Sequence, residues 1–71
     1  MKFEYLVIFS QKIGGGWYPI SLNDKPLPAE ERKKTLYAYA NERGAEGWEI
    51  VDVWRAGVYQ QWTFKRLPPN G

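Results

Sequence analysis

The chain contains 71 residues, has a net charge of +2 and contains neither cysteine nor histidine. A chain of this length forms one domain, 1–71, and the missing side chains exclude disulfides, cysteine-ligated zinc and the usual general base of catalysis at neutral pH. Four Trp, five Tyr and three Phe are present, so we expect aromatic side chains to provide much of the core.

The first strand is expected at residues 2–12. β-Branched and aromatic side chains dominate this segment, as is typical of strands. Apolar residues occupy both alternating sets of positions, with Phe3, Tyr5, Val7 and Phe9 in one set and Leu6 and Ile8 in the other. This pattern favours a strand that is covered on both faces.

Three glycines, Gly14–Gly16, end this strand and predict a hairpin tip. They do not fit a phosphate-binding loop, because no Lys-Ser/Thr pair follows them. Residues 17–22 predict a short second strand, which Pro19 confines to the edge of the sheet because proline has no N–H to donate. A turn is expected at Asn23–Lys25.

One helix is expected from Pro28 to Arg43. Proline suits the first turn of a helix, where an N–H has no partner, and Glu30 and Glu31 lie near the positive end of the helix dipole. Gly44 is expected to end the helix as the residue that takes a positive φ. The apolar stripe of this helix contains few large side chains, so we expect only a few residues to pack it against the sheet.

Two further strands are expected after the helix. The segment 48–55 predicts a strand with Trp48, Ile50 and Trp54 on one face and Val51 and Val53 on the other. Ala56-Gly57 predicts a tight hairpin, and 58–66 predicts the last strand. Residues 66–71 are expected to form a flexible tail.

These elements predict an α+β fold: a small antiparallel sheet of three to four strands with one α-helix packed on one face, in the order β-β-α-β-β. The stretch from Gly44 to Trp48 is interpreted as the corner between the helix and the third strand. In this interpretation Gly44 caps the helix, Glu46 lies in the connection, Gly47 permits a tight backbone path and Trp48 packs over the helix end.

The residues "GAEGWEIV" (44–51), preceded by a helix and followed by "FKR" (64–66), resemble a family of small bacterial and phage proteins. This is the domain-of-unknown-function family number forty-one seventy-seven, whose hallmark is a helix ending in Gly-Ala-Glu-Gly-Trp-Glu-Leu-Val. The resemblance includes the aromatic opening strand "FEYLVI" and covers nearly the whole chain apart from "GGGWYPISLNDKP". One difference is Arg43, where the family usually has an apolar residue. The resemblance implies the fold, and it carries no established activity.

Aromatic side chains near basic ones are the candidate binding residues. Trp and Tyr beside Arg or Lys can stack on bases or nucleotides, and they can equally pack in a core or in a self-association surface. The candidates are Trp17, Tyr18, Trp54, Arg55, Tyr59 and Trp62.

No catalytic or metal-binding constellation is expected, and no cofactor. Glu46, Glu49 and Asp52 are three residues apart, so on a strand they should alternate between faces instead of converging as a catalytic pair. The chain has no Asp-x-Asp loop pattern for a hard cation. Tyr, Lys and Glu retain the capacity for acid, base or nucleophilic chemistry, but we predict a protein that is not an enzyme.

The surface charge predicts few interactions with nucleic acid or membranes. Acidic and basic residues are interspersed, and only "ERKK" (31–34) hints at a basic patch. No apolar run approaches the roughly 18 residues of a membrane span. The basic, then apolar opening is too short and too polar for a signal peptide, so we expect a cytoplasmic protein.

One helix covers one face of a sheet, yet residues 2–12 and 48–55 are apolar on both faces. The surplus apolar surface predicts at least a homodimer, with copies stacked sheet on sheet or joined edge to edge. We therefore expect a small oligomeric binding or adaptor module. The alternative is a phage- or bacteria-encoded protein that sequesters a nucleotide-like ligand between subunits, using aromatic stacking and Arg.

Overall fold

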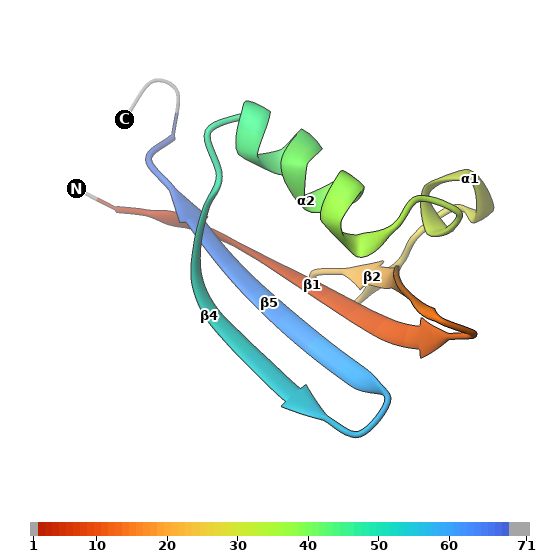
Figure 1. Cartoon of the computed structure of the whole chain (residues 1–71). Coiled ribbons are helices and arrows are strands. Elements are labelled where there is room, and N and C mark those ends of the chain that lie inside the picture. Colours follow the sequence, from red (N-terminus) through yellow and green to blue (C-terminus); the bar gives the residue numbers. More distant parts are fainter. Residues whose placement is uncertain (1, 69–71) are drawn as a thin grey trace.

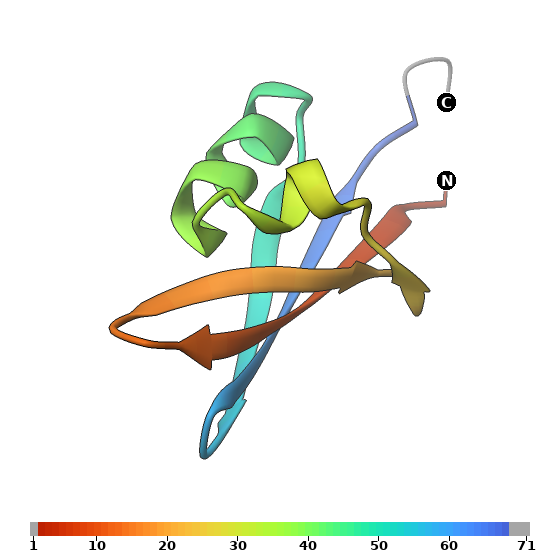
Figure 2. The same ribbon diagram turned by 90° about the vertical axis from the view of Figure 1, so that its right-hand side faces the viewer.

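The computed structural model describes residues 2–68, which form five strands and two helices (Figure 1). In chain order these are β1 (Glu4–Ile13), β2 (Gly16–Leu22), β3 (Lys25–Pro26), α1 (Ala29–Arg32), α2 (Leu36–Ala45), β4 (Glu49–Ala56) and β5 (Tyr59–Arg66). The strands form one antiparallel sheet in the order β3-β2-β1-β5-β4. Both helices lie on the same side of this sheet (Figures 1 and 2). The α+β prediction is confirmed, whereas the expected number of strands and of helices is wrong.

The central strand β1 has the two apolar faces that its sequence predicts. Leu6, Ile8 and Ser10 are buried on the side of the helices. Because side chains alternate along a strand, Val7 and Phe9 face the other side, on which neither of the two described helices lies. We call this uncovered side of the sheet the open face.

Pro19 lies in a strand that is only partly an edge. β3 pairs with β2 at Ser21 and Leu22 alone, so β2 has no outer neighbour at Pro19. The pairing of β1 with β2 shifts register between Phe9 and Ser10, which is a β-bulge next to this proline. The edge prediction therefore holds for the proline itself but misses β3.

The predicted turn after β2 is present, and it explains β3. Asn23 and Asp24 have φ values of 49° and 68°, as in the two-residue turns that join tight hairpins. Asn23 also accepts the N–H of Val7 through Oδ1 at 2.8 Å. This hydrogen bond ties the turn to the end of the β1–β2 ladder.

The single helix expected from Pro28 to Arg43 is wrong, because the helix is broken at residues 33–35. Thr35 is the N-cap of α2, and its Oγ1 accepts the N–H of Ala38 at 3.2 Å. A threonine that caps a new helix competes with continuation of the preceding one. The break lets both Leu27 and Leu36 reach the core, where each is buried.

An ion-pair cluster joins the two helices across this break. The Nζ atom of Lys34 lies 2.9 Å from Glu42 of α2 and 3.2 Å from Glu31 of α1. The hydrogen bond to Glu42, and then the one to Glu31, raise the pKa of Lys34 above its ordinary value. The cluster is exposed, so its contribution to stability is small.

The glycine that ends α2 is Gly47 and not the predicted Gly44. Gly44 lies inside the helix, and Gly47, with φ of 93°, takes the left-handed position after it. The N–H of Trp48 donates to Arg43 at 3.2 Å and the N–H of Gly47 donates to Gly44 at 3.0 Å. These two bonds form a Schellman motif, in which the second glycine is the C′ residue.

The strand β4 contains a β-bulge that the sequence pattern does not reveal. Ile50 pairs with Phe64 and Asp52 with Thr63, so Val51 is an extra residue. The bulge reverses the faces of the residues after it. Val53 therefore lies on the helix side with Ile50, and the prediction that Trp54 shares the face of Ile50 is wrong.

The core lies between the sheet and α2 and is small. Its buried apolar members are Leu6, Ile8, Leu27, Leu36, Tyr39 and Phe64. Burial raises the pKa of the Tyr39 phenol, while Arg43, whose guanidinium lies 4.8 Å from the ring centroid, opposes this shift. Arg43 thus packs on the helix side where the resembling family has an apolar residue. Of the expected tail, Arg66 belongs to β5, and residues 69–71 lie outside the described part of the chain.

Candidate functional site

The open face carries a row of side chains that crosses the sheet from β2 to β4. Cross-strand pairs place Ser21 beside Phe9, Phe9 beside Gln61, and Gln61 beside Trp54. The ring of Tyr59 stacks on Phe9 with centroids 5.3 Å apart. The row therefore mixes aromatic and hydrogen-bonding side chains, as binding surfaces do.

A shallow pocket of about 350 Å³ lies on this row. Val7 and Phe9 contribute apolar side chains to its lining, and Ser21, Asp24 and Gln61 contribute polar ones. The volume falls at the lower end of small-molecule sites, which span about 300–1,000 Å³. This pocket was not predicted, because its residues come from three strands and a turn that are distant in the sequence.

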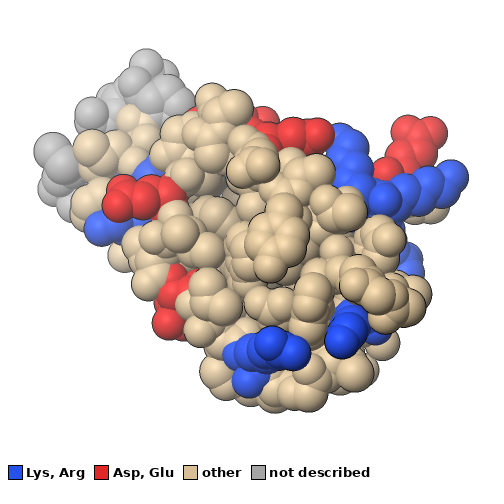
Figure 3. All heavy atoms as spheres, in the orientation of Figure 1, with Lys and Arg blue, Asp and Glu red and all other residues tan. Residues whose placement is uncertain are grey.

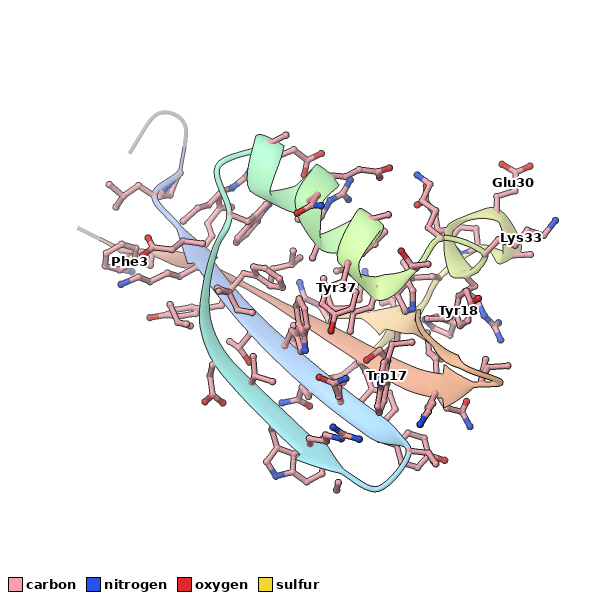
Figure 4. All side chains as sticks on the ribbon, in the orientation of Figure 1. Phe3, Trp17, Tyr18, Glu30, Lys33 and Tyr37 are labelled. Carbon is pink, nitrogen blue, oxygen red and sulfur yellow. The ribbon has the colours of Figure 1, made fainter. Side chains whose placement is uncertain are left out.

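A second group, the helix-side cluster, consists of Trp17, Tyr37, Arg55, Gln60 and Trp62. The Arg55 guanidinium lies over the ring of Trp17, 5.2 Å from its centroid. Tyr37 meets Trp62 edge to face at 5.5 Å, and Trp62 Nε1 donates to Gln60 Oε1 at 2.9 Å. Figure 4 shows Trp17 over the sheet and Tyr37 projecting from the first turn of α2 on the same side.

The sheet divides the six candidate binding residues between its two faces. Trp17, Arg55 and Trp62 lie on the helix side, in the helix-side cluster. Tyr18, Trp54 and Tyr59 lie on the open face by strand alternation and register. The six side chains therefore form no single site within one subunit.

Buried polar groups in this region are satisfied. Ser10 is fully buried, and its hydroxyl donates to the carbonyl oxygen of Gln60 at 3.0 Å. Gln60, 7 % exposed, accepts from Trp62 as described above. Neither residue stood out in the sequence. Their role follows from strand pairing, because β1 and β5 bring positions 50 residues apart into contact.

The acidic residues are arranged differently from the prediction. Because of the bulge, Glu49 and Asp52 face the same side, opposite Lys65 and Thr63. Glu46 lies at the helix end, 3.3 Å from the guanidinium of Arg43. Within residues 2–68, no three His, Cys, Asp or Glu side chains gather in a way that could hold a metal ion.

The motif Gly44, Glu46, Gly47 and Trp48 forms the corner between α2 and β4. Arg66 holds this corner from the end of β5. Its guanidinium lies 4.2 Å from the centroid of the Trp48 ring, and its Nη1 donates to the carbonyl of Glu46 at 2.9 Å. These contacts hold the corner together, while Gly44, Glu46 and Gly47 are exposed and Trp48 is half-buried.

The edge strand β4 is the most exposed apolar segment. All eight of its residues are exposed. Of eleven large apolar side chains exposed within residues 2–68, six lie in the β4–β5 hairpin: Ile50, Val51, Val53, Trp54, Val58 and Tyr59. Sequence reasoning predicted surplus apolar surface over a whole face of the sheet. The structure concentrates it at one edge.

Charged side chains do not gather into a patch of one sign on the face drawn in Figure 3. Its centre is uncharged, and basic and acidic side chains lie around the rim. Glu30 of α1 and Lys33, which directly follows α1, project away from the body of the molecule (Figure 4). Neither helix in the described part of the chain has the length and apolar character needed to cross a membrane.

Comparison of the chain with protein-family models, with curated proteins and with solved structures gives no match. The resemblance carried by Gly44–Val51 therefore stays a prediction. The structure and its surfaces are the basis for assigning a function.

Proposed function

We propose that the protein is a small homo-oligomeric binding module with no catalytic activity of its own. The observation that carries this proposal is the exposed apolar surface of β4, with Val53 and Trp54 each 52 % exposed. Soluble monomers rarely leave a contiguous apolar patch uncovered, and such patches mark interaction sites. The helices cannot shelter this surface, because they pack over β2 and the core while β4 stays exposed on both faces.

The open face is the second element of the proposal. It offers a stacked aromatic pair, Phe9 and Tyr59, beside the hydrogen-bonding groups of Ser21, Gln61 and Asp24. A surface with this mixture is suited to a partner or ligand that is partly apolar and partly polar. Self-association through β4 and binding on the open face use different atoms and are compatible.

The proposal is tested by measuring the mass in solution. Size-exclusion chromatography with multi-angle light scattering should give a multiple of the 8.3 kDa chain mass at tens of micromolar protein. Diluting the sample should shift the mass toward one chain if the association is reversible. A mass of 8.3 kDa at all these concentrations contradicts the proposal.

A second candidate function is sequestration of a nucleotide-like ligand. The observation that favours it is the helix-side cluster, where Arg55 and the exposed ring of Tyr37 flank Trp17 and Trp62. Aromatic rings stack on a base, and an arginine contacts a phosphate through charge-assisted hydrogen bonds. Both chemistries are present within this one group of side chains.

Thermal-shift measurements with nucleoside mono-, di- and triphosphates separate the two candidates. Sequestration requires a rise in Tm that is lost in Arg55→Gln and kept in Arg32→Gln, whose side chain is exposed on α1. No shift with any nucleotide dismisses sequestration and leaves the oligomeric module standing.

A further inference from the structure

We propose that β4 pairs in antiparallel fashion with β4 of a second copy of this chain, in a register centred on Trp54. The inference rests on the self-association proposed above and specifies its geometry. A two-fold axis perpendicular to the sheet would join the two sheets edge to edge. Both sets of helices would then lie on one side, and the open faces would join on the other.

The two edges of the sheet differ in their capacity to pair. At one edge β3 has two residues, one of them Pro26, and beyond it β2 presents Pro19. Prolines and short strands block pairing at an edge. At the other edge β4 has eight residues and no proline, and apolar side chains point to both of its faces. Among the strands of residues 2–68 only β4 offers a free ladder, so two copies would meet through the same strand and the assembly would close as a dimer.

The bulge and the charges select the register. Beyond the bulge, the regular part of β4 runs from Asp52 to Ala56, and its centre is Trp54. A register centred on Trp54 sets Trp54 against its own copy, Asp52 against Ala56, and Val53 against Arg55. Registers centred on Asp52 or on Arg55 would instead place like charges directly opposite, which destabilises a sheet. A register centred on Val53 would set the bulged Val51 against Arg55.

The direction of Arg55 supports this pairing. Its guanidinium lies over the ring of Trp17 on the helix side of the sheet. Trp17 belongs to β2, and β1 and β5 lie between β2 and β4, so the Arg55 side chain points from the β4 edge toward the middle of the sheet. The positive charge is therefore drawn away from the two-fold axis, and the helix side of the edge presents Val53.

On the open face, the row of Ser21, Phe9, Gln61 and Trp54 would continue into the same row of the second copy in reverse order. The contact is small, about 1,000 Å² in total or less, so we expect a micromolar dissociation constant.

Disulfide trapping tests the register directly, because the chain has no native cysteine. In the double variant Asp52→Cys/Ala56→Cys, each cysteine faces its counterpart in the other copy at a Cα separation of about 5 Å, within disulfide range. Within one chain the same two positions are about 13 Å apart and cannot bond. The double variant should therefore form a covalent dimer under mild oxidation, at least about tenfold faster than either single variant.

The single variants are the matched controls. Both positions lie on the open face, so a dimer stacked face to face would let a single variant cross-link as readily as the double variant. Equal rates, or no covalent dimer while light scattering still reports a dimer, overturn the β4 pairing and leave the oligomeric module standing. A monomeric mass overturns both proposals.

A substitution keeps the test independent of cysteine chemistry. Trp54→Lys places a charge on the edge and should reduce the mass to that of one chain, with an unchanged circular dichroism spectrum. Tyr5→Glu, on the open face of the central strand β1, 59 % exposed and opposite Lys65, should leave the dimer intact. A dimer that survives Trp54→Lys and dissociates with Tyr5→Glu contradicts the edge pairing.

Discussion

Replacing Gly47 and Gly44 separately by alanine should change stability in opposite directions. The two glycines are three residues apart, and a Cβ atom built at either position meets nothing within 4 Å. Steric crowding therefore contributes to neither substitution, and only the backbone conformation distinguishes them. Comparing the stabilities of the two variants therefore shows at which residue α2 ends.

At Gly47 the φ of 93° disfavours any residue with a Cβ. The left-handed conformation costs a non-glycine residue about 1–2 kcal/mol, so Gly47→Ala should lower the free energy of unfolding by about that amount. For a domain of this size, 1 kcal/mol corresponds to about 4–8 °C in Tm. The expected loss is about 4–16 °C.

At Gly44 the chain is helical, and glycine is about 0.5–1 kcal/mol less favourable than alanine inside a helix. Gly44→Ala should therefore raise the Tm by about 2–8 °C. Thermal unfolding followed by far-ultraviolet circular dichroism measures both shifts. If Gly44→Ala lowers the Tm while Gly47→Ala is neutral, the helix ends at Gly44 and our assignment of the Schellman motif is wrong.

Three further substitutions test the core, the cap of α2 and the buried phenol. Leu36→Ala, at a fully buried position, should lower the free energy of unfolding measured by urea titration by about 2–5 kcal/mol, a large share of the roughly 4–10 kcal/mol expected for the whole domain. Ile13→Ala, at a position that is 56 % exposed, should change it little. Equal losses in the two variants would contradict the assignment of Leu36 to the core. Thr35→Ala should cost about 0.5–2 kcal/mol through loss of the N-cap hydrogen bond, and an unchanged urea midpoint would remove the cap from the explanation of the helix break. Because burial raises the pKa of Tyr39 above 10.0, its contribution to stability is complete below about pH 10 and is lost as the pH rises through the folded-state pKa. Tyr39→Phe should therefore show a weaker loss of stability between pH 9 and 11 than the parent chain, and parallel pH profiles would contradict the assignment.

The proposed dimer also makes sense of the composition of β4. A monomer with Val53 and Trp54 exposed at an unprotected edge would be prone to unspecific edge pairing. In a two-fold dimer the free backbone N–H and C=O groups of β4 would hydrogen-bond to those of the second copy. The edges that remain unpaired would then be the proline-containing edges at β3 and β2. In the proposed pairing the bulge at Val51 would end the β4–β4 ladder at Asp52 and so limit its length.

The elements and turns of this protein follow from neighbouring residues. Gly14, Asn23–Asp24 and Gly57 mark the hairpins, because each has a positive φ, which glycine adopts readily and which asparagine and aspartate tolerate. The alternating apolar pattern of β1 and β5 gives their two faces directly, since side-chain direction in a regular strand depends only on position. Local chemistry of this kind is contained in the sequence itself.

The tertiary structure decided what depends on distant contacts. The bulge at Val51 arises where β4 pairs with β5, and it reverses the faces of Val53 and Trp54, which alternation alone places incorrectly. The helix break allows both Leu27 and Leu36 to be buried, a requirement set by the sheet and not by helix propensity. The strand order decides which strands the ten-residue helix α2 covers and which edge of the sheet it leaves exposed. That order comes from pairing between segments far apart in the chain, and no local pattern encodes it.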